Sequence, residues 1–71
     1  MAGNGLIKRS VNLFGHATSI SLEPVFWRAL KRAADEEGLP LNTLVARIDE
    51  ARTTNLSSAI RVWLFERALG H

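Results

Sequence analysis

Hydrophobic and polar positions alternate in one short segment near the start of the chain, HATSISLEP. In an extended chain, successive side chains point to opposite sides, so even-numbered and odd-numbered residues separate here. The even side includes Ile20 and Leu22, whereas the odd side carries only small residues. This pattern predicts a β-strand over about 17–22 with one apolar side.

Apolar residues recur at helical spacing in three later segments, which predicts helices at about 24–37, 41–51 and 56–69. Pro24 suits a first helical turn, where its missing N–H is no loss. Gly38 suits the left-handed position that follows a last turn. The predicted fold class is therefore mostly α, with one strand ahead of three helices.

The helix at 56–69 is apolar almost all round. One face can cover the other two helices of the same chain, and it consists of Leu56, Ala59, Ile60, Trp63 and Leu64. A second face, formed by Val62, Phe65 and Leu69, would be exposed in a free monomer and would invite association. We expect this second face to need another protein surface.

The segment KRSVNLF at 8–14 allows two interpretations. Gly15 and His16 can form a turn of type II′ that joins two short strands into a hairpin. Alternatively the segment is an extended arm with a glycine kink, because apolar residues shift from odd positions (Val11, Leu13) to even positions in the strand. We favour the arm.

The composition sets further bounds. Residues 1–7 contain two glycines and little pattern, which predicts a flexible N-terminus ahead of a single domain over 8–71. A chain of 71 residues without cysteine has no disulfides to staple it, and it hides only about 60% of its unfolded surface. Oligomerisation is the stabiliser that remains.

Several function classes find no support in the sequence. No apolar run reaches the ~20 residues of a membrane span, and no signal-peptide order is present, so we expect a cytoplasmic protein with no membrane partner. No glycine-rich phosphate loop, nucleophile motif or metal-ligand spacing occurs. We therefore expect no enzyme activity and no cofactor. The net charge of +2 is weak evidence for a polyanionic partner.

An isolated strand is unstable in water, so the strand at 17–22 needs a partner. The simplest arrangement is a homodimer in which this strand pairs antiparallel with its own copy. Ile20 and Leu22 then face the helices, and we expect them to form the dimer core with Trp63 and Phe65. The odd-numbered side faces outward as a two-stranded ribbon.

The order of these elements resembles the ribbon-helix-helix family of DNA-binding proteins, of the Arc and MetJ type. The resemblance is carried by the motifs GHATSISLE, FWRAL, GLPLNTLV and NLSSAIRV and covers roughly 8–67. The chain looks like a bacterial branch of that family with an additional third helix. The resemblance implies double-stranded DNA as partner, a homodimer that can assemble further on DNA, and a role in transcription regulation.

The resemblance also implies which residues touch DNA. The outward residues of the ribbon, Ala17, Ser19 and Ser21, would enter the major groove, and Asn42 and Thr43 would approach a phosphate at the start of the second helix. These strand residues are shorter than the Arg, Lys, Asn or Gln that such ribbons often carry, which implies weak base discrimination. Three residues just before the strand would compensate: Lys8, Arg9 and His16.

Simpler interpretations of the same residues stay open. Lys8 and Arg9 can be solubilising charges, Asn42 and Thr43 can cap a helix, and the strand serines can merely face solvent. The alternative function is a homodimeric protein-interaction module with weak or no DNA binding, in which the third helix binds a protein partner.

Overall fold

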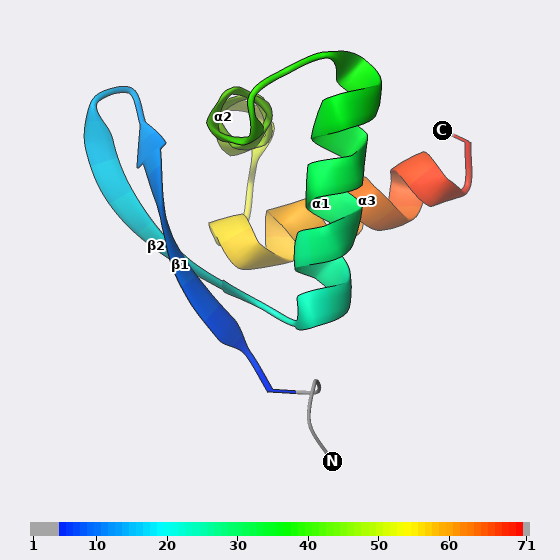
Figure 1. Ribbon diagram of the computed structural model, residues 1–71, viewed down its shortest axis with the longest axis horizontal. Coiled ribbons are helices and arrows are strands. Elements are labelled where there is room, and N and C mark those ends of the chain that lie inside the picture. The colour runs from blue at the N-terminus through cyan, green and yellow to red at the C-terminus, as the bar shows by residue number, and fades with distance from the viewer. Residues whose placement is uncertain (1–4, 71) are drawn as a thin grey trace.

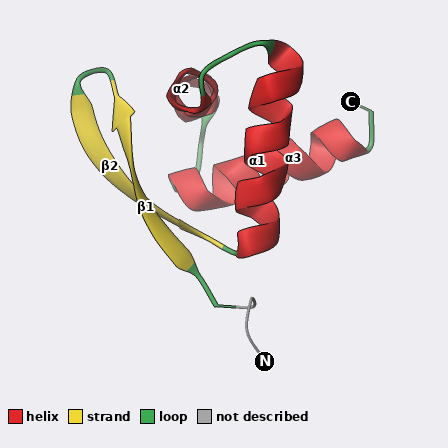
Figure 2. Ribbon diagram, viewed as in Figure 1, coloured by secondary structure: helices red, strands yellow, loops and turns green. Residues whose placement is uncertain are grey.

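The structure, a computed structural model, describes residues 5–70. Two strands form an antiparallel hairpin that packs on one side of three helices (Figures 1 and 2). The elements in chain order are β1 (Ile7–Leu13), β2 (His16–Leu22), α1 (Pro24–Glu37), α2 (Leu41–Ala51) and α3 (Leu56–Ala68). This arrangement confirms the ribbon-helix-helix fold with a third helix.

Residues 8–13 belong to β1 and Phe14 to the turn that follows it, so the interpretation that we favoured, an extended arm, is wrong. The hairpin closes at the pair Leu13–His16 through a two-residue turn, Phe14–Gly15. Both turn residues have positive φ, 54° and 83°, as a type I′ turn requires. A two-residue turn pairs odd positions of β1 with even positions of β2. The parity shift that favoured an arm is thus a consequence of the hairpin.

The strand therefore has a partner within its own chain, contrary to the premise from which self-pairing was argued. β1 pairs with β2 from Ile7–Leu22 to Leu13–His16. Within residues 5–70, no backbone–backbone hydrogen bond joins the edge of either strand that faces away from its hairpin partner to another element. Pairing of β2 with its own copy therefore stays a prediction. Ile7 lies in β1 and not in a flexible N-terminus; residues 1–4 lie outside the described part of the chain.

One hydrophobic core holds the hairpin to the helices. Alternate residues of each strand face it, and the helices contribute the stripes that their spacing predicted. The core residues are Val11, Leu13, Ile20, Leu22, Trp27, Leu30, Ala33, Ala34, Leu44, Val45, Ile48, Ile60 and Leu64. Ile20 and Leu22 are 2% and 0% exposed within a single chain, so they need no second chain to cover them.

Polar contacts connect elements that the core brings together. The indole Nε1–H of Trp27 on α1 donates to the backbone carbonyl of Ile7 at 2.8 Å. At the far end of α1, Glu36 and Glu37 accept hydrogen bonds from the Arg67 guanidinium of α3, at 3.1 and 2.7 Å. Acids at a helix C-terminus oppose the helix dipole. The ion pairs with Arg67 explain why acidic residues occur at this end of α1.

Local rules account for the end of α1 and the start of α3, whereas α1 and α2 begin without a side-chain cap. Gly38 is left-handed (φ 69°) and ends α1, and Asn55 caps α3 by accepting from the Ser58 N–H at 2.9 Å. Leu69 follows α3 as its C-cap residue and does not belong to the helix. α2 has no side-chain cap. No helix among residues 5–70 is long and apolar enough to cross a membrane.

Candidate nucleic-acid interface

The side of the hairpin that faces away from the helices carries mostly short, polar side chains. Directly opposed residues of an antiparallel pair share one side of the sheet. The outer pairs are Lys8–Ser21, Ser10–Ser19 and Asn12–Ala17. Ser21 is half-buried and the other five residues are exposed. We call these six residues the outer face.

The predicted contact residues near the strand fall on both sides of the hairpin. Lys8, Ala17, Ser19 and Ser21 share the outer face. Arg9 instead lies opposite Ile20, on the side that carries the core residues, and His16 lies opposite Leu13 on that same side. The Arg9 guanidinium carbon lies 5.3 Å from the centre of the Trp27 ring, a cation–π distance.

Two outer-face residues, Ser10 and Asn12, were missing from the sequence-based prediction. The arm interpretation gave the side chains of 8–14 no defined side, so neither residue could be placed. The parity shift around Phe14–Gly15 was the signal that could have found them. Asn12 changes the chemistry of this face, because an asparagine amide can form a bidentate pair with adenine.

The excess of positive over negative charge in this protein lies on the hairpin. The chain has nine Lys and Arg and seven Asp and Glu, a net charge of +2. Residues 5–22 contain Lys8 and Arg9 and no acid, which leaves seven basic and seven acidic residues in the rest of the chain. The hairpin therefore carries a charge equal to the net charge of the whole protein. A positive, acid-free surface attracts polyanions.

The second helix, α2, lies close to the hairpin. α2 contacts β1, and Figure 1 shows α2 beside the end of the hairpin that carries the turn. Asn42 is exposed and Thr43 half-buried in the first turn of α2. Neither side chain caps the helix. The interpretation of these two residues as caps is therefore wrong, and the positive end of the α2 dipole is available to an anion.

An ion pair fixes the residue that follows β2. The carboxylate of Glu23 accepts a hydrogen bond from Arg61 Nε of α3 at 3.0 Å. The pKa of Glu23 lies below its ordinary value, because of a hydrogen bond to backbone at Glu23 itself and then because of Arg61. This contact ties the exit of the ribbon to α3.

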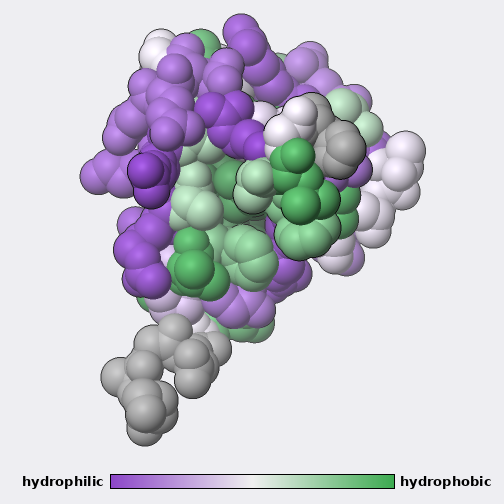
Figure 3. Space-filling model, turned by 90° about the vertical axis from the view of Figure 1, so that its right-hand side faces the viewer, coloured by the Kyte–Doolittle hydropathy of each residue, from purple (hydrophilic) through white to green (hydrophobic). Residues whose placement is uncertain are grey.

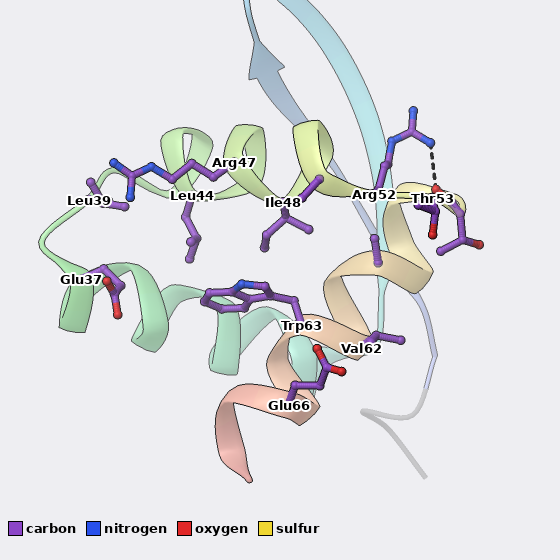
Figure 4. Close-up of a pocket in the computed structure, with 13 residues that line it drawn as sticks. Glu37, Leu39, Leu44, Arg47, Ile48, Arg52, Thr53, Val62, Trp63 and Glu66 are labelled. Atoms are coloured by element: carbon purple, nitrogen blue, oxygen red, sulfur yellow. Dashed lines mark hydrogen bonds between the residues drawn. The ribbon is translucent and has the colours of Figure 1, made fainter. Parts of the chain in front are cut away.

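A groove of about 570 Å³ lies between α2 and α3. Leu44 and Ile48 point from α2 toward the Trp63 ring of α3, with charged side chains at the rim (Figure 4). The charged lining residues are Glu37, Glu66, Arg47 and Arg52, which balance one another. This groove therefore lacks the positive excess of the hairpin. Among residues 5–70 no cluster of His, Asp or Glu could hold a metal ion.

A hydrophobic surface lies on the opposite side of the molecule from the hairpin. Val62, Phe65 and Leu69 are each more than half exposed, as the sequence predicted for the second face of the third helix. With Phe26 of α1 they line a shallow apolar hollow. Figure 3 shows hydrophobic residues gathered on this side of the protein. We call these four residues the α3 patch. Trp63 is half-buried on the neighbouring side of α3.

Comparison with known proteins identifies the family. The family described as ribbon-helix-helix domain matches residues 6–68. The chain therefore belongs to the ribbon-helix-helix family, whose domains generally bind DNA as transcription regulators.

Among solved structures, the chain is similar to an uncharacterized protein from Bordetella pertussis Tohama I, with 27% identity and a TM-score of 0.78. The match covers 94% of this chain and 58% of that protein, so the chain spans less than two thirds of its structural relative. No curated protein matches the chain significantly.

Proposed function

We propose that this protein is a homodimeric transcription regulator that inserts its hairpin into the major groove of double-stranded DNA. One observation carries the proposal. The outer face is an exposed row of small polar side chains on a hairpin that holds the net positive charge and no acid. The protein acts by occupying a DNA site, without a cofactor and without catalysis.

The dimensions of the hairpin fit this role. Paired strands lie about 4.8 Å apart, and the major groove is about 12 Å wide, enough to admit a two-stranded ribbon. The ribbon is complete within one chain, so insertion does not require strands from two chains. Asn12 can pair with adenine and the serines can bond either type of base edge. Ala17 offers a contact to a thymine methyl group.

Phosphate contacts would position the ribbon. The Lys8 ammonium lies at the end of the outer face that is remote from the turn, where it can reach the DNA backbone. The N–H groups at the start of α2, near Asn42 and Thr43, offer a second phosphate site. Arg9 and His16 lie on the opposite side of the hairpin and are not part of the proposed reading surface.

The α3 patch supports self-association. Val62, Phe65 and Leu69 form an exposed apolar surface that a second copy of the chain would cover. A two-fold dimer presents two ribbons, so the DNA target would consist of two related half-sites. Phe65, a predicted dimer-core residue, is central to this proposal; Ile20 and Leu22 are not, since their own chain buries them.

Selection from a random pool of DNA duplexes tests the proposal. We expect recurring half-sites, and binding of a recovered duplex that weakens steeply as salt rises, because bound phosphates release counterions. Ser19→Glu places an acid in the middle of the outer face and should abolish binding while the far-UV circular dichroism stays unchanged. Absence of binding at low salt would contradict the proposal.

The protein-interaction alternative rests on the same α3 patch. If that patch binds a different protein, then Phe65→Glu would leave the oligomeric state of the isolated chain unchanged. If it forms the homodimer, Phe65→Glu would convert the protein to a monomer in sedimentation, and we expect this second result.

A further inference from the structure

The turn of the hairpin places a phenylalanine where the backbone disfavours one. Phe14 has φ 54°, and it is the one residue other than glycine with positive φ among residues 5–70. A type I′ turn prefers Asn or Asp at this position, followed by Gly. In a bulky L-residue, a left-handed conformation brings Cβ too close to the following carbonyl oxygen. The position after it, Gly15, follows the rule.

Within residues 5–70, Phe14 gains no burial in the core that would compensate for this conformation. Phe14 is 63% exposed and does not belong to the hydrophobic core or to the partly buried residues packed against it. An asparagine would satisfy the turn better and would expose no apolar surface. Folding alone therefore gives no reason for a phenylalanine, and strain of this kind is found at binding sites.

The location of Phe14 indicates what it contacts. The turn follows the closing pair Leu13–His16, one residue beyond Asn12–Ala17, which is the last pair of the outer face. It also lies on the acid-free hairpin, on the opposite side of the molecule from the C-terminal part of α3 (Figure 1). A polyanion seated on the outer face would lie next to this turn.

We propose that Phe14 is a specificity-determining residue that contacts thymine methyl groups in the major groove at the end of the ribbon. Apolar side chains recognise this methyl group, which distinguishes thymine from the other bases in that groove. With Ala17 beside it, Phe14 gives the turn end of the hairpin a preference for thymine that the serines cannot supply. This inference rests on the proposed DNA-binding function.

Phe14→Asn tests the inference, because it should move stability and DNA affinity in opposite directions. Relief of the turn should raise the Tm by about 5 °C. Loss of the methyl contact should weaken binding of a recovered duplex about tenfold. Phe14→Gly provides a second variant that also suits the turn. Val25→Asn, which removes an exposed apolar side chain from α1, is the matched control and should leave affinity unchanged.

A second experiment removes the methyl group from the DNA. Replacing the thymines of the duplex by uracil should weaken binding of the wild-type protein about tenfold. It should weaken the Phe14→Asn variant clearly less, because only the methyl contact of Ala17 is then left to lose. Equal affinity of wild type and variant, or no uracil effect on the wild type, would overturn the inference. Failure of the wild-type protein to bind any duplex would instead overturn the proposed function. A change in self-association in place of DNA affinity would show that Phe14 contacts protein.

Discussion

The two sides of the hairpin differ in burial, although their residues alternate along the same two strands. On the inner side, Ile20 and Leu22 are almost completely buried beneath the helices. On the outer side, Ser19 and Ser10 oppose each other in solvent. A β-strand exposes alternate residues to opposite environments, so stability and recognition can be assigned to neighbouring residues. The consequence is that adjacent substitutions should have unrelated effects.

The largest effect should come from the inner side. Leu22→Ala removes a fully buried side chain and should lower the free energy of unfolding by about 2–5 kcal/mol. Ser19→Ala on the outer side should change it by less than about 0.5 kcal/mol. Urea denaturation of the two variants measures both values. Equal losses would mean that the two sides do not divide these roles.

A smaller effect is expected from the polar side chain best suited to base recognition. Asn12→Ala should reduce discrimination at one adenine position by about 1–3 kcal/mol, because the bidentate amide contact is lost. Stability should change little, since Asn12 is exposed. Binding of the selected duplex and of a duplex with that adenine replaced gives the measurement. Unchanged discrimination would exclude Asn12 from the reading surface.

The contribution of Lys8 should appear mainly in the salt dependence. Lys8→Ala removes one proposed phosphate contact, so the slope of log affinity against log salt should decrease by about 0.9 for each Lys8 in contact. Lys31→Ala is the matched control, because Lys31 is also exposed but lies on α1. Equal slopes for the two variants would place Lys8 outside the interface.

The weakest effect concerns the ion pair directly after the inner strand. The pKa of Glu23 is below its ordinary value of 4.5, so this group stabilises the fold above that pH and loses its contribution as pH falls through the lowered pKa. The wild-type protein should therefore exceed Glu23→Gln in stability near neutral pH, and the difference should shrink in acid. A difference independent of pH would contradict this account. Urea denaturation at several pH values measures it.

The sequence predicted the helices and the buried sides well because periodicity records burial directly. The helical spacing of apolar residues predicted three helices, and α2 buries Leu44, Val45 and Ile48 on one side. Gly38 marked the end of α1, which the structure confirms. The hairpin was one of two interpretations, with its turn placed at Gly15–His16, one residue beyond the observed turn Phe14–Gly15. The arm was favoured because the parity shift was assigned to a kink, and Phe14 is an unusual residue for a left-handed turn position.

The sequence predicted only part of the candidate site, because the pairing of β1 with β2 was not the favoured interpretation. Ala17, Ser19 and Ser21 share a side because they alternate within one strand, which the sequence alone shows. Ser10 and Asn12 join them only through cross-strand pairing. Contacts such as Arg67 with Glu36 and Glu37 depend on tertiary packing between residues 30 and 31 positions apart, and no local pattern encodes them.

The central claim is that the outer face of the hairpin is where duplex DNA binds. The most direct test is to titrate the ¹⁵N-labelled protein with a selected duplex and follow the backbone amide shifts. We predict that the largest changes occur at the outer-face residues, at Phe14–Gly15 and at the start of α2, and that they diminish as salt rises. Changes concentrated at the α3 patch, with the hairpin amides unmoved, would contradict the claim.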